Sequence, residues 1–191
     1  MLKWFVDSLI RRAARTPYFN LPGYMNRDWL VPYRQEQKRL LPGPWLALPP
    51  EPALRAPEPL MIETFDGTGP VPFLKRPIAW VLQQFNIAVR VHHILRSDRD
   101  RNSHDHPWPY LSIVLKVGYW EERYDDSGTC VSRRWHGPGS VIFRRAGSWH
   151  RLDIPAGKTA VTLFITFKYR QRWGFNVGGK KISYRDYTGE Q

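Results

Sequence analysis

The stretch Ser103-His104-Asp105-His106-Pro107 carries two histidines two residues apart. On a β-strand, residues i and i+2 point to the same side, so these two imidazoles would lie side by side. Two imidazoles placed in this way can hold one metal ion. A third histidine, His150, follows Gly139 and Gly147 much further along the chain. A closed barrel would bring its strand beside the first one. The sequence therefore predicts a metal site made of His104, His106 and His150.

The chain around these histidines has the pattern of a β protein. Short apolar or alternating runs are separated by turn signals, of which Asp125-Asp126-Ser127-Gly128 is the strongest. We expect strands at residues 88–95, 111–124 with a bend at Gly118, 131–135, 140–143 and 161–169. Many short strands with regular turns indicate an all-β sandwich or barrel.

The spacing of histidines and glycines resembles the two motifs of the cupin family. The first family motif places a His-x-His pair and a glutamate between two glycines, and the second leads from a glycine through Pro-x-Gly to a histidine. Six residues fall at those spacings, within about residues 90 to 170: His104, His106, Gly118, Gly139, Gly147 and His150. The resemblance implies a cupin-type double-stranded β-helix, which is a jelly-roll barrel. It extends to small uncharacterised cupins of phages and bacteria, which show a similar run into Arg172-Trp173-Gly174-Phe175.

The chain departs from the family pattern at the glutamate and proline positions. The glutamate position falls at Tyr110 or Leu111, so the resemblance implies the three-histidine variant, as in thiol dioxygenases. Glu121 or Glu122 of the next strand stays open as a source of a carboxylate. Arg145 stands where the family has proline.

These residues predict a metal-dependent cupin enzyme, a non-haem iron oxygenase acting on a small anionic or polar molecule. Three neutral ligands leave the metal its positive charge and open positions for substrate, water or dioxygen. Fe(II) is favoured as the divalent ion, with Ni, Mn and Zn as alternatives. Arg145 is predicted to orient the carboxylate or phosphate of the substrate, unless it is a solvated arginine at the rim. Tyr110 is predicted to donate a hydrogen bond in the pocket, unless it only packs there.

The alternative function is a non-catalytic binding or accessory protein of a phage or bacterium that contacts a protein or nucleic-acid partner. The net charge of +12 suits nucleic acid, acidic surfaces or anionic small molecules. This charge is spread along the chain and no reading motif is present, so nucleic acid is not favoured. A homodimer is left open.

We expect three parts in the chain: residues 1–60, a barrel over 61–175 and a C-terminal tail over 176–191. Residues 2–15 are amphipathic and predict a helix that packs on the barrel, with a membrane-surface or targeting helix as the alternative. The proline-rich segment 41–59 predicts an extended connector over the barrel, with a partner's aromatic groove as the alternative.

Cellular location is predicted from three absences in the sequence. The chain has one cysteine, Cys130, so an intramolecular disulfide is excluded. No apolar run is long enough for a membrane span, and the first residues lack the pattern of a secretory signal. We therefore expect a cytoplasmic protein that does not insert into membranes.

Overall fold

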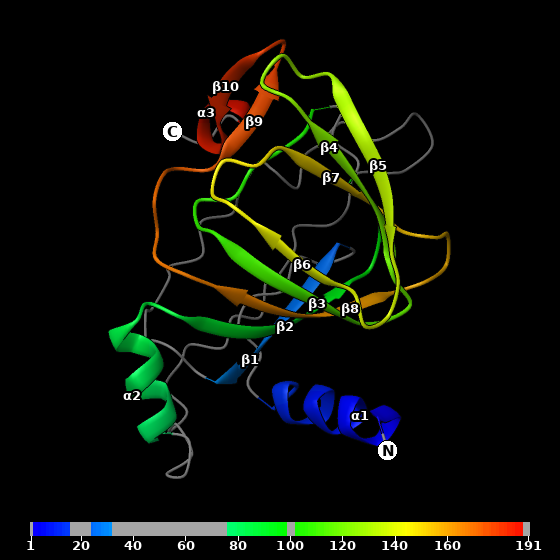
Figure 1. Ribbon diagram of the computed structural model, residues 1–191, viewed down its shortest axis with the longest axis vertical. Helices are drawn as coiled ribbons and strands as arrows, with labels where there is room; N and C mark the ends of the chain where they lie inside the picture. The colour runs from blue at the N-terminus through cyan, green and yellow to red at the C-terminus, as the bar shows by residue number, and fades with distance from the viewer. Residues whose placement is uncertain (1, 16–23, 32–75, 99–101, 189–191) are drawn as a thin grey trace.

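The computed structural model describes residues 2–15, 24–31, 76–98 and 102–188 (Figure 1). Three of its elements are helices: α1 (Leu2–Ala13), α2 (Arg76–Gln84) and α3 (Tyr184–Thr188). The strands up to the middle of the chain are β1 (Met25–Val31), β2 (Ala88–Ile94), β3 (Tyr110–Lys116), β4 (Tyr119–Tyr124) and β5 (Cys130–His136). The remaining strands are β6 (Val141–Arg144), β7 (His150–Asp153), β8 (Ala160–Thr166), β9 (Gly174–Val177) and β10 (Lys180–Ser183).

Two antiparallel sheets face each other and form the barrel (Figure 1). One sheet has the order β1-β2-β8-β3-β6 and the other has the order β5-β4-β7. Several pairs of consecutive strands alternate between the sheets, namely β3 and β4, β5 and β6, β6 and β7, and β7 and β8. This alternation is the winding of a jelly roll, so the predicted fold class is confirmed. The hairpin of β9 and β10, together with α3, lies at one end of the barrel (Figure 1).

The inner and outer faces of the five-stranded sheet carry separate apolar clusters. Buried residues from both sheets fill the barrel: Ile94, Val114, Tyr119, Ile142, Ile154 and Ala160. On the outer face, Val91 and Val161 pack against Ala13 of α1. The expected amphipathic helix is therefore present as α1, and its apolar side lies on the sheet.

The bend expected at Gly118 separates β3 from β4. Gly118 has a φ of +110°, and a Cβ atom there would lie 2.4 Å from the carbonyl oxygen of His136. Glycine is required because any other side chain would collide with this backbone.

Several strands differ from the sequence-based expectation, and β9 and β10 are among those that were not expected. The last long strand ends at Thr166 and not at Tyr169, and the chain then leads to the C-terminal hairpin. β1, which was not anticipated, extends the barrel sheet by pairing with β2.

The proline-rich segment 41–59 lies outside the described residues, so its packing and the three-part division of the chain stay predictions. None of the described helices is long and apolar enough to cross a membrane.

Candidate metal centre

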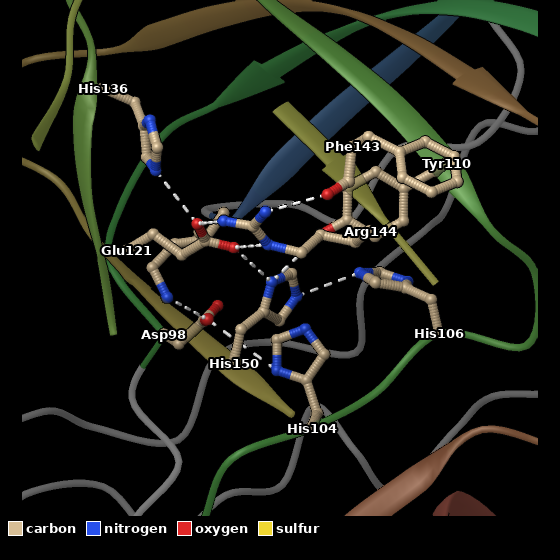
Figure 2. Close-up of polar contacts among 10 residues, drawn as sticks. Asp98, His104, His106, Tyr110, Glu121, His136, Phe143, Arg144 and His150 are labelled. Carbon is tan, nitrogen blue, oxygen red and sulfur yellow. Dashed lines mark hydrogen bonds and ion pairs between the residues drawn. The ribbon is translucent and has the colours of Figure 1, made fainter. Parts of the chain in front are cut away.

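Three histidine side chains converge inside one end of the barrel (Figure 2). One ring nitrogen from each of His104, His106 and His150 lies within 4.8 Å of the others. His106 Nε2 and His150 Nε2 are 3.1 Å apart. The structure thus brings together the three histidines that the sequence selected as metal ligands.

Backbone pairing holds two of these side chains next to each other. The amide of His104 donates to the carbonyl of His150 at 3.1 Å, and the amide of His150 donates back at 2.9 Å. Residues that exchange both hydrogen bonds lie directly opposite each other, with their side chains on one face. His106 lies two residues further on, outside any strand, and its ring centroid is 5.4 Å from that of His104.

The orientation of the His150 ring is set by Glu121 of β4. His150 Nδ1 lies 3.2 Å from Glu121 Oε1, and both side chains are buried. An ionised carboxylate can only accept hydrogen bonds, so Nδ1 carries the proton and donates to it. The lone pair of His150 is then on Nε2, which faces His106.

Two further side chains, Arg144 and His136, contact the carboxylate of Glu121 (Figure 2). Arg144 Nε donates to Glu121 Oε1 at 2.8 Å, and the same guanidinium also pairs with Oε2. His136 Nε2 lies 3.0 Å from Glu121 Oε2. Burial alone would raise the pKa of Glu121, but the hydrogen bonds from His150 and Arg144 outweigh it and lower the pKa below its usual range.

Burial also keeps the other two histidines neutral. It lowers the pKa of His104 to about 4, and it lowers the pKa of His106 well below its usual value. Neutral imidazole is the form that binds metal ions, so the rings of His104 and His106 have a lone pair to offer.

The carboxylates of Asp98 and Asp105, which flank this region, have structural partners. Asp98 Oδ2 accepts a hydrogen bond from the amide of Leu152 at 2.7 Å and lies 3.8 Å from His104 Nδ1. Asp105 is fully buried, accepts a hydrogen bond from the amide of Gly174 at 2.8 Å and pairs with Lys181. Asp105 therefore ties the C-terminal hairpin to the segment between two candidate ligands.

The two residues predicted to act on a substrate occupy different places. Tyr110 is buried, and its hydroxyl oxygen lies 3.0 Å from His150 Nδ1. Arg145 follows β6 and its side chain is exposed, whereas the preceding Arg144 is the arginine that reaches Glu121. Tyr110 is therefore in contact with the histidine cluster.

The three histidines fit a transition-metal ion by their chemistry, and the pair His106 and His150 also fits by its spacing. If two nitrogens each lie about 2.1 Å from one ion, and the two bonds enclose a right angle, the nitrogens are about 3 Å apart. The distance of 3.1 Å between His106 Nε2 and His150 Nε2 agrees with this value. The proton on His150 Nδ1 points away, toward a carboxylate, as in the carboxylate–histidine pairs of metal sites.

The strands that carry the two sequence motifs therefore meet at one cluster of histidines inside a jelly roll. The fold is the jelly roll that the resemblance to the cupin family implies. No family model matches the chain, and no curated protein matches it.

Several solved structures match part of this cupin-type chain. A proposed mannose-6-phosphate isomerase from Ralstonia eutropha JMP134 is 16% identical with a TM-score of 0.38, over 44% of this chain and 75% of that one. Oxalate oxidase in complex with glycolate is 15% identical with a TM-score of 0.38, over 47% and 46% of the two chains. Hydroxypropylphosphonic acid epoxidase from S. wedmorenis is 14% identical with a TM-score of 0.35, over 44% of each chain. The match thus spans less than half of the last two proteins, and at these values it carries no argument about function.

Two residues of the site were not selected as site residues from the sequence. Arg144 was passed over in favour of Arg145, and Glu121 was only one of two open carboxylates. A local signal existed for Glu121, because it is two residues from Tyr119 and shares its inward face in β4.

Proposed function

We propose that this chain is a metal-dependent cupin enzyme, a non-haem iron oxygenase that acts on a small anionic or polar molecule. The observation that carries the proposal is the pair of facing nitrogens, His106 Nε2 and His150 Nε2, with the far side of His150 held by an ionised Glu121. A histidine with only a structural role has no need of this arrangement. His104 completes the ligand set.

A metal such as Fe(II), bound by three imidazoles, supplies a Lewis acid with open positions for substrate, water or dioxygen. The protein's own residues supply the surroundings. Glu121 and Arg144 fix the His150 ring. The hydroxyl of Tyr110, which contacts the Nδ1 edge of that ring, is proposed to donate a hydrogen bond in the pocket. Fe(II) is proposed over Ni, Mn and Zn because the proposed reaction uses dioxygen.

Elemental analysis of the purified protein tests the metal centre. We expect about one transition-metal ion per chain, and we expect His104→Ala to remove it. His93→Ala is the matched control, because His93 lies on β2, pairs with Asp28 at 3.7 Å and is not in the cluster. Metal content that is the same in wild type and His104→Ala would contradict the site.

Activity is tested separately, by oxygen consumption of the Fe(II)-loaded protein with a panel of small carboxylates and phosphorylated compounds. Turnover that disappears in His150→Ala supports an oxygenase. Arg145 stays a predicted substrate-orienting residue, and Arg145→Ala should weaken turnover while metal content stays the same. Metal binding without turnover on any compound would favour the non-catalytic binding protein.

A further inference from the structure

A second group of side chains lines the inner face of the five-stranded sheet beside the histidines. Arg90 and His92 of β2 share the face of Ile94, which belongs to the barrel core, and both are buried. The His92 ring stacks on Phe164 of β8, with centroids 4.4 Å apart. Phe164 lies 6.0 Å from the ring of His106. One aromatic ring therefore separates this group from a proposed metal ligand.

Two buried polar atoms of this group lack a hydrogen-bond partner within the described part of the chain. They are His92 Nε2 and Trp108 Nε1. Buried polar groups are nearly always paired, so each exception needs an explanation. An indole N–H can only donate, and Trp108 therefore requires an acceptor that the described residues do not provide. An acceptor oxygen of a ligand would satisfy Trp108, and it would also satisfy His92 in the tautomer that carries the proton on Nε2.

The charges around this group are positive. The Arg90 guanidinium lies over the rings of Trp29 and Trp108, 4.5 and 5.9 Å from their centroids. Arg27 of β1 is directly opposite His92 in the strand register. Burial lowers the pKa of His92 most, and the residues that add to this effect are all basic: Arg27, Arg90 and His93. A site with this field attracts anions.

We propose that Arg90, His92 and Trp108 bind the oxyanion of a small substrate, a carboxylate or a phosphate-type group, whose other end reaches the three histidines. This inference rests on the proposed function, because it places the anion beside the metal centre. Trp29 and Trp108 contact the Arg90 guanidinium through their rings, and a guanidinium can also pair with an oxyanion through its N–H groups. An anion there would also accept hydrogen bonds from Trp108 and His92.

Titration with inorganic phosphate and with acetate tests the site. The protein is loaded with Zn(II), which is diamagnetic, and the indole N–H signal of Trp108 is followed by NMR after assignment with Trp108→Phe. We expect one of the two anions to shift this signal saturably, and calorimetry should show at least tenfold weaker binding in Arg90→Gln. The anion that binds more tightly distinguishes a carboxylate substrate from a phosphate-type one. Arg134→Gln, which removes an exposed charge from β5, should bind like wild type.

His92→Phe separates ligand binding from a structural role. The substitution keeps a ring against Phe164 but removes the unpaired nitrogen. We expect anion binding at least fivefold weaker, with a Tm in the absence of anion that is unchanged or higher. A lower Tm with unchanged affinity would assign His92 to the core and contradict its place in the site.

Two outcomes would overturn the inference. One is the absence of any shift of the Trp108 signal with either anion, and the other is equal affinity in wild type and Arg90→Gln. Metal content is measured in the same samples. Anion binding without metal would contradict the proposed function alone, whereas metal without anion binding would contradict this site alone.

Discussion

Glu121 and Arg144 form an ion pair inside the barrel, and the loss of one partner should cost more than the loss of both. Glu121→Gln leaves the Arg144 charge largely buried without its counter-ion. Breaking one side of such a pair costs about 3–5 kcal/mol, and Arg144 keeps a side-chain exposure of 17%. We expect the free energy of unfolding, measured in urea, to fall by about 3 kcal/mol. Glu121→Gln/Arg144→Met should lose less than the sum of the two single variants, and additive losses would contradict the pairing.

Glu121→Gln also tests how the His150 ring is oriented. Partners that orient a metal-binding histidine typically contribute about 10–100-fold in metal affinity. We expect a loss of this size in competition with a chelator. Glu122→Gln is the matched control, because Glu122 accepts a hydrogen bond from the Tyr124 hydroxyl at 2.8 Å and pairs with Arg133. Equal losses in the two variants would show that Glu121 does not orient His150.

For single residues, the sequence predicts the three histidines but not Glu121 and Arg144, which hold the His150 ring. His104 and His106 share a local pattern, and their spacing to His150 resembles a family motif. Arg144 and Arg145 are neighbours, and only the strand register decides which of them faces the interior. Glu121 acquires its role from β7, because it lies opposite Leu152 while its side chain meets His150. Such a contact across strands is not visible in a single sequence.

The geometry of the turn between β3 and β4 depends on a single glycine, Gly118. At Gly118 a Cβ atom would meet backbone at 2.4 Å, whereas at Gly139, with a φ of +88°, nothing lies within 4 Å. Gly139→Ala should cost about 1 kcal/mol for its left-handed backbone alone. Gly118→Ala should lose roughly twice as much or more, because the backbone must also move. Equal losses in urea denaturation would show that the close contact is relieved without cost.

Alternation of apolar residues predicts most of the strands but not where β8 ends. Val161, Leu163 and Ile165 alternate as expected, and Phe167 and Tyr169 continue the pattern beyond the strand. The partner strand β3 begins at Tyr110, opposite Thr166. Pro109, which precedes it, has no N–H group with which to extend the ladder. The end of β8 is therefore set by its neighbour and not by its own sequence.

β1 is not predicted from the sequence, because the polar residues Asn26, Arg27 and Asp28 interrupt the alternation of apolar and polar residues.

For the whole molecule, metal binding should raise thermal stability. A ligand that binds only the folded state at 100 times its Kd adds about 2.7 kcal/mol. For a chain of this length that corresponds to a rise in Tm of about 5–10 °C. Calorimetry with and without a chelator should show this difference in wild type and in His93→Ala. His150→Ala should melt at the same temperature in both conditions, and a chelator effect that survives this substitution would place the metal elsewhere.

The position of β8 between β2 and β3 also has a consequence for the order of events during synthesis. The ribosome makes β2 (88–94) and β3 (110–116) early. Neither strand can form its ladder with β8 until residues 160–166 have been made. His104 likewise meets His150 only after the intervening chain has emerged. Pairing between such distant segments makes folding slow, and the waiting strands expose unpaired edges to other chains. A nascent chain that stops before residue 160 thus lacks both the barrel and its histidine cluster, and it would depend on chaperones to stay in solution.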